Sequence, residues 1–198
     1  MSLARAAWPA LLLAALASGC VQAPANDTEC TPNAHRSREE RALKGDVRAQ
    51  YWLGVELARG TCGIQDPASA DALLRQAAAQ DFPPASHLLG VLLRRDGLYV
   101  DALASFEKAA GQGFQLAIAD IGLTYAAADS PLRDLTLAYA WLTLALAREA
   151  DPQAEQVLES ARDGVIREMT STALEKARGV ATGLEEKFRG IPAWSDRE

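Results

Sequence analysis

Apolar residues, many of them alanine, recur from residue 37 to residue 188 at spacings that return to one face of an α-helix. Short segments with glycine, proline or aspartate interrupt this pattern, and such residues mark the ends of helices. The pattern predicts nine helices, over about 37–44, 48–59, 67–80, 84–95, 99–111, 115–127, 131–148, 152–167 and 171–188.

Several of these helices begin with a recognisable cap. Asp66, Ser130 and Asp151 each precede a proline, which suits a capping side chain followed by proline at the first helical position. Ser37 and Thr172 have the spacing of a capping box. These signals support the predicted division into helices.

The predicted helices follow a repeat. In each unit the first helix carries an alanine five residues before a glycine, and the second helix carries two alanines seven residues apart. The first-helix pairs are Ala49 and Gly54, Ala85 and Gly90, and Ala117 and Gly122; the second-helix pairs are Ala70 and Ala77, Ala102 and Ala109, and Ala138 and Ala145. The glycines are 36 and 32 residues apart, a period typical of stacked helical hairpins.

Glycine inside a helix costs about 1 kcal/mol relative to alanine. Three glycines at equivalent positions therefore predict a compensating contact, in which a neighbouring helix packs against bare backbone. Gly111 and Gly113 are expected to end the helix before the third unit, where glycine readily adopts a left-handed conformation.

Composition agrees with an all-α chain. Its 198 residues are 49% hydrophobic but rich in alanine and poor in aromatics, which favours closely packed helices over a β-sandwich. The formal net charge of −6 gives an acidic surface that repels phosphate backbones, so nucleic acid is excluded as a partner.

The first 19 residues read as a signal peptide. An early arginine, an apolar run of about a dozen residues and the small residues Ser18 and Gly19 precede Cys20, and the run is too short to span a membrane. The segment "LASGC" resembles the lipobox of bacterial lipoproteins, which implies acylation of Cys20, and Val21 implies sorting to the outer membrane. Residues 20–36 are then the lipidated N-terminus and tether. Cleavage after Ala25, giving a soluble periplasmic or secreted protein, is the alternative.

Two other cysteines, Cys30 and Cys62, form an even pair in an oxidising compartment. They flank the first predicted hairpin at the same end, so a disulfide between them is expected. Two unpaired thiols are the alternative.

The repeat resembles the Sel-one-like repeat, a subclass of the tetratricopeptide-like helical repeats, over about residues 37–150. The residues that carry the resemblance are Ala49, Leu53, Gly54, Gly60, Asp66, Ala70, Ala77, Ala78, Ala85, Leu89, Gly90, Ala102, Lys108, Ala109, Ala110, Gln112, Gly113, Ala117, Gly122, Tyr125, Ala138 and Ala145. The second unit lacks the usual glycine and aspartate loop between its helices. The resemblance implies an α/α solenoid, a right-handed superhelix of hairpins, followed by a helical cap over 151–189 and a frayed tail over 190–198. Trp194 in that tail is able to fold back onto the cap.

The same resemblance implies a concave face that holds a protein or peptide. The positions carried onto this face are Tyr51, Val55, Ala58, Arg59, His87, Val91, Arg94, Arg95, Ala119, Leu123, Ala126 and Ala127. Their aromatic, aliphatic and arginine side chains suit a partly acidic polypeptide. The alternative is that the arginines only solvate helix ends.

Motifs for catalysis are scarce. His35 and His87 fall in different elements, so no metal site is predicted, and no cofactor motif is present. Ser105 and Lys108 have the S-x-x-K spacing of penicillin-recognising enzymes, and some Sel-one-like proteins are linked to β-lactam binding or hydrolysis. The companion motifs are missing, and Lys108 is the repeat's own lysine. The sequence therefore predicts a non-catalytic scaffold in the cell envelope, with a β-lactam- or peptidoglycan-directed hydrolase as the alternative. The apolar run 135–147 is expected to be a buried helix.

Overall fold

The computed structural model describes residues 31–62 and 64–195. Within those ranges the chain forms nine α-helices and no strand. They are α2 (Pro32–Leu43), α3 (Val47–Arg59), α4 (Pro67–Ala79), α5 (Pro83–Arg95), α6 (Tyr99–Gly111), α7 (Gln115–Ala126), α8 (Leu135–Arg148), α9 (Pro152–Arg167) and α10 (Ser171–Phe188). The predicted all-α fold is confirmed.

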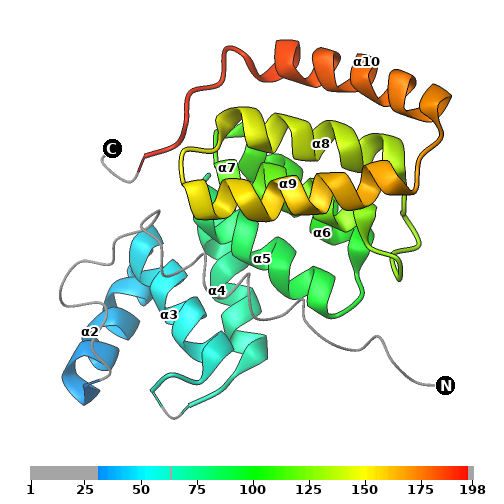
Figure 1. The fold of residues 1–198 in the computed structure, drawn as a ribbon. Coiled ribbons are helices and arrows are strands. Elements are labelled where there is room, and N and C mark those ends of the chain that lie inside the picture. The colour runs from blue at the N-terminus through cyan, green and yellow to red at the C-terminus, as the bar shows by residue number, and fades with distance from the viewer. Residues whose placement is uncertain (1–30, 63, 196–198) are drawn as a thin grey trace, which may run out of the picture.

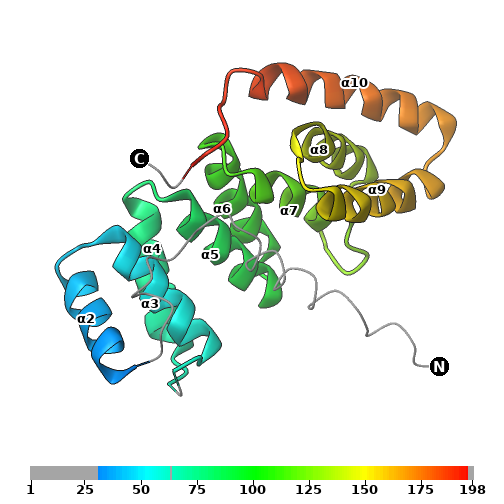
Figure 2. The same ribbon diagram turned by 60° about the vertical axis from the view of Figure 1, so that its left-hand side comes forward.

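Neighbouring helices in the sequence pack against one another as a stack of hairpins (Figure 1). The hairpins are α3 with α4, α5 with α6, and α7 with α8, and α2 packs on the outer side of α3. At the other end α8 lies between α9 and α10, as its end-on view in Figure 2 shows.

The three repeated glycines lie where the two helices of each hairpin meet. A Cβ atom added at any of them would overlap a large side chain of the partner helix. The contacts are Gly54 with Leu74 (2.9 Å to Cγ), Gly90 with Phe106 (2.6 Å to Cε1) and Gly122 with Leu142 (2.9 Å to Cγ). Close packing against bare helix backbone, predicted from the repeat, is therefore confirmed.

The turns between hairpins also repeat. Gly45, Asp81 and Gly113, each four residues before a repeat alanine, have φ angles of 86°, 59° and 86°. Left-handed backbone is uncommon for residues other than glycine, and aspartate tolerates it better than most. The left-handed conformation expected near the end of α6 is present at Gly113, whereas Gly111 is the last residue of the helix.

Two predicted helix starts are wrong. The first helix begins at Pro32, five residues before Ser37 and inside the predicted tether, because Thr31 caps it by accepting a hydrogen bond from the Ala34 N–H (3.2 Å). The seventh begins at Leu135 instead of residue 131. Asp134 caps it by accepting from two backbone N–H groups, whereas the Ser130 hydroxyl accepts from Leu132 within a turn.

The apolar run in α8 is core, as expected. Trp141, Leu142 and Leu144 are buried where α8 meets its neighbours, and Trp141 packs edge-on against Phe188 of α10 (5.5 Å between centroids). No helix in the described part of the chain is long and apolar enough to cross a membrane.

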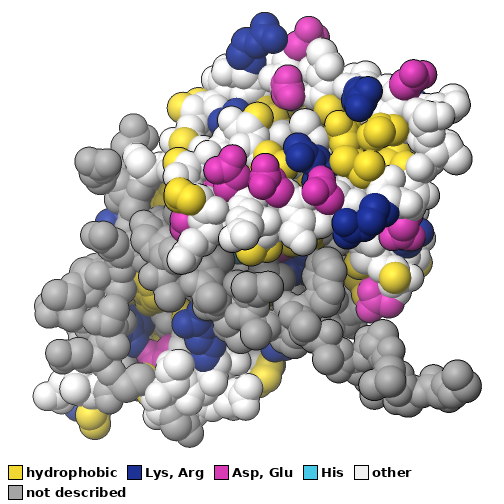
Figure 3. All heavy atoms as spheres, viewed as in Figure 1, with side chains coloured by type: hydrophobic (Ala, Val, Ile, Leu, Met, Phe, Trp, Pro, Cys, Tyr) yellow, Lys and Arg dark blue, Asp and Glu magenta, His cyan; other side chains and the backbone are white. Residues whose placement is uncertain are grey.

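The last two helices, which were predicted to form a cap, are largely accessible to solvent. Only a few of their residues are buried: Leu158 and Val165 in α9, and Ala177, Ala181 and Phe188 in α10. Acidic and basic side chains are interspersed over α9 and α10, with an apolar area between the two helices (Figure 3). A polar outer surface is what the end of a helical stack requires to face water.

Candidate peptide-binding face

The positions predicted to line a groove differ in accessibility. All lie on α3, α5 or α7, or directly after α7, but only some of them are open to solvent. Tyr51, Val55 and His87 are buried; Ala58, Val91, Arg94, Ala119, Leu123, Ala126 and Ala127 are half-buried; Arg59 and Arg95 are exposed. Ala58 and Arg95 come together at a shallow hollow that is also lined by Pro67 and Asp71 of α4.

Tyr51 belongs to an aromatic cluster. It is 2% exposed, and its ring meets those of Trp52 and Phe82 edge-on, with centroids 5.0 and 5.4 Å apart. Edge-to-face pairs add stability beyond the area they bury. Tyr51 therefore joins α3 to the start of α5 and has little surface for an external ligand.

His87 and Arg94 are held by a carboxylate from the next hairpin. The His87 Nε2 lies 2.7 Å from Oδ2 of Asp120, and the Arg94 Nη1 lies 3.0 Å from its Oδ1. Asp120, on α7, is 1% exposed, and a buried carboxylate requires such partners. Both predicted groove residues thus tie α5 to α7. Sequence reasoning missed Asp120, although an aspartate inside the apolar segment "LAIADIG" is a signal of a buried ion pair.

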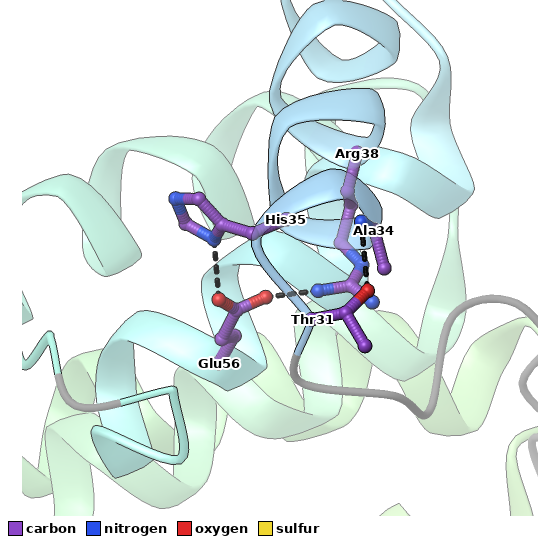
Figure 4. Close-up of polar contacts among 5 residues, drawn as sticks. All are labelled: Thr31, Ala34, His35, Arg38 and Glu56. Atoms are coloured by element: carbon purple, nitrogen blue, oxygen red, sulfur yellow. Dashed lines mark hydrogen bonds and ion pairs between the residues drawn. The ribbon is translucent and has the colours of Figure 1, made fainter.

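A second buried ion cluster fixes α2 to α3. The Glu56 carboxylate pairs with the imidazole of His35 and the guanidinium of Arg38, which both reach it from α2 (Figure 4). Arg38 and Glu56 are 3% and 4% exposed. Each histidine therefore has a structural partner, and the described residues contain no group of three side chains suited to a metal ion.

Ser105 and Lys108 are engaged by the repeat itself. The Ser105 hydroxyl donates to the Asp101 carbonyl (2.9 Å) one turn earlier in α6. The Lys108 ammonium donates to the Ala78 carbonyl and lies 3.1 Å from Oδ1 of Asp81, in the turn that joins the preceding hairpin to α5. These contacts account for both side chains as parts of α6 and of its packing on α4.

The cysteine predictions fall largely outside the described residues. Cys20 and Cys30 lie outside the described residues, and Cys62 follows α3. Lipidation of Cys20 and the disulfide between Cys30 and Cys62 stay predictions.

The segment after α10 departs from the prediction of a frayed tail. Residues 191–194, which we call the strap, turn back from α10 and reach the repeats instead of the cap (Figure 1). Arg148 holds its start by donating to the carbonyls of Phe188 (3.0 Å) and Ile191 (2.6 Å). The backbone N–H of Trp194 donates a hydrogen bond to the Gly113 carbonyl (2.9 Å).

The Trp194 ring packs between two phenylalanines. Its centroid lies 5.8 Å from that of Phe82 and 5.7 Å from that of Phe114, with interplanar angles of 86° and 64°. Phe82 and Phe114 each stand three residues before a repeat alanine, at the starts of α5 and α7, so they are equivalent positions of successive repeats. The strap thus crosses from one hairpin to the next.

Comparison with solved structures finds the same architecture. The chain is similar to the Sel1 repeat protein from Oxalobacter formigenes, with 25% identity over 66% of this chain and 100% of that chain, and a TM-score of 0.54. The chain folds as a Sel1 repeat protein. A protective antigen present in uropathogenic Escherichia coli strains and displaying an SLR fold also matches, with 18% identity over 83% of this chain and 45% of that chain and a TM-score of 0.39. No protein-family model and no curated protein matches the chain.

The Sel1 repeat fold explains where the polar residues lie. Each hairpin needs its neighbours to cover its apolar faces. The buried pair at Asp120 and the Lys108 contact connect one hairpin to the next, and the buried pair at Glu56 connects α2 to the first hairpin. The chain is therefore a helical-repeat scaffold in which most of the conspicuous side chains serve the stack.

Proposed function

We propose that this chain is an exported scaffold that holds a protein or peptide partner in the cell envelope through its Sel1 repeats. One observation carries the proposal: the Gly54, Gly90 and Gly122 contacts close three successive hairpins, and these hairpins form a continuous stack because α4 packs on α5 and α6 packs on α7. Such a stack places α3, α5 and α7 side by side, and extended surfaces of this kind are what repeat proteins use for binding.

The exposed residues on the face formed by α3, α5 and α7 are the positions from which a bound partner can be crosslinked. Arg59 and Arg95 end α3 and α5 and are open to solvent, whereas Tyr51 and His87 are buried. A photo-crosslinking amino acid is therefore placed at Arg59 and, separately, at Arg95. Matched control positions are Arg75 on α4 and Glu107 on α6, which are exposed on the other helix of each hairpin.

The expected result is that one and the same protein is captured in cells from Arg59 and from Arg95, and not from Arg75 or Glu107. Capture of nothing from the first pair, or of the same protein from all four positions, would remove the proposed face.

Export rests on the first 20 residues of the sequence. We infer that Cys20 is acylated and that the protein is anchored to the outer membrane, with soluble release after Ala25 as the alternative. Cells fed an alkynyl fatty acid should label the natural chain, and Cys20→Ser should abolish the label and move the protein from the membrane to the soluble fraction. Unchanged fractionation without label would favour the soluble form.

A further inference from the structure

The strap packs against two residues that occupy the same position in successive repeats. Phe82 and Phe114 begin α5 and α7, and neither helix start receives a side-chain cap. A phenylalanine cannot satisfy the free N–H groups of a helix start, so these positions forgo a capping hydrogen bond. What they provide instead is a pair of rings, 7% exposed for Phe82 and 4% exposed for Phe114, with the Trp194 indole packed between them.

Gly113 supplies the main-chain part of the site. A Cβ atom there would overlap the Pro192 carbonyl oxygen and would lie 3.0 Å from the Trp194 backbone nitrogen. The φ of 86° also favours glycine. The strap therefore approaches bare backbone, and the Gly113 carbonyl accepts the Trp194 N–H.

The strap meets this site with few contacts of its own. Pro192 and Ala193 are exposed, and a Cβ atom at Gly190 would meet nothing within 4 Å. Arg148 fixes the strap only as far as the Ile191 carbonyl. Beyond that point, within the described residues, the strap is held to the repeats by the backbone hydrogen bond and the aromatic ring of Trp194, which is how an extended peptide with a single anchor binds.

We propose that Phe82, Gly113 and Phe114 form a binding site for an extended peptide segment with tryptophan two residues after proline, and that the strap is its internal competitor. This rests on the proposed function, since it names the class of polypeptide that the repeats hold. The partner segment replaces the strap, donates its backbone N–H to the Gly113 carbonyl and places its indole between the two phenylalanines.

The effect of the strap on the affinity for an external peptide can be estimated. A tethered segment acts at an effective concentration on the order of millimolar, so an external peptide of equal intrinsic affinity is disfavoured until it exceeds that concentration. Removing the Trp194 indole abolishes the competitor and leaves the site intact. The apparent affinity for an external segment should then rise at least tenfold.

The test uses the full chain and a fluorescein-labelled peptide, acetyl-Ile-Pro-Ala-Trp-Ser-amide, with binding measured by fluorescence anisotropy. Trp194→Ala should bind the probe at least tenfold more tightly than the natural chain. The added change Phe114→Ala should abolish that gain, and a probe with alanine in place of tryptophan should not bind. Circular dichroism reports whether each variant keeps its helices, and Trp194→Leu provides a milder second variant.

Several results would overturn this inference. Equal affinity of Trp194→Ala and the natural chain, no saturable binding up to millimolar probe, or insensitivity to Phe114→Ala would each do so. Loss of helical signal in both Trp194 variants would make the indole a core residue. Dimers of the natural chain that dissociate on Trp194→Ala would instead make a second copy the occupant. If the peptide-binding tests fail while the crosslinkers at Arg59 and Arg95 still capture a partner, the proposed function stands without this site.

Discussion

Gly90 offers the most direct test of how the hairpins are held together. In Gly90→Ala the new Cβ would lie 2.6 and 2.7 Å from two Phe106 ring carbons and 3.1 Å from the Ala102 carbonyl oxygen. The Phe106 ring is fully buried, lies beneath the Arg94 guanidinium (5.6 Å) and borders His87, so it has no room to turn away.

The two opposing effects differ in size. Alanine in place of glycine within a helix gains about 1 kcal/mol. Overpacking a well-filled core costs about 1–3 kcal/mol or more, and here backbone as well as a ring must shift. We expect the overlap to outweigh the gain, so that Gly90→Ala lowers the free energy of unfolding by about 1–2 kcal/mol. Gly111→Ala is the matched control, since its Cβ would meet nothing within 4 Å, and it should be neutral or stabilising.

Urea unfolding followed by circular dichroism at 222 nm measures both variants. A second cycle uses Phe106→Leu, which shortens the obstructing side chain. If ring overlap is the cause, Gly90→Ala should cost less in the Phe106→Leu background than in the natural one. A Gly90→Ala chain as stable as Gly111→Ala, or an equal cost in both backgrounds, would refute the packing argument.

Three further changes test other parts of the molecule. Glu56→Ala removes the carboxylate that Arg38 holds in a buried pair and should cost about 3–5 kcal/mol in urea unfolding, whereas Asp71→Ala, which breaks an exposed pair, should cost less than about 1 kcal/mol. Ser105→Ala should leave partner capture and thermal stability unchanged, and an effect on β-lactam turnover would revive the hydrolase alternative. Burial acts to raise the pKa of Asp46, but hydrogen bonds from the Ala49 N–H and Arg41 outweigh it and lower the pKa below its usual range. This stabilisation is present above the unfolded pKa and is lost as pH falls through the folded one, so the stability advantage over Asp46→Asn should shrink from pH 5 to pH 2.

The hairpin register could be predicted because it depends on residues close together in sequence. Alanine and glycine at fixed spacing mark where helix backbones approach, and the structure places all three glycines there. The large residues that fill these contacts were not predicted. Leu74, Phe106 and Leu142 each stand four residues after the first repeat alanine of their helix, but spacing alone does not reveal which apolar residue faces the glycine.

The accessibility of the predicted face could not be read from the sequence. His87 and Asp120 are 33 residues apart, and their pairing depends on how one hairpin stacks on the next. The strap was missed for a similar reason. Its site combines rings from two successive hairpins with a glycine turn, and the tail sequence itself contains no helical pattern that would have indicated a docked segment.

The three equivalent turns explain why the strap binds at one place in a repeating molecule. The site needs bare backbone at the left-handed position, and Gly113 provides it. At the preceding turn the same position is Asp81, whose carboxylate is held by Lys108 and by the Gln112 side chain (3.1 Å), so a strand of peptide cannot approach that backbone in the same way. At the first turn Gly45 is bare, but Asp46 follows it where the others have phenylalanine. The residues that repeat therefore form the stack, and the residues that differ between the equivalent turns restrict the strap to one site.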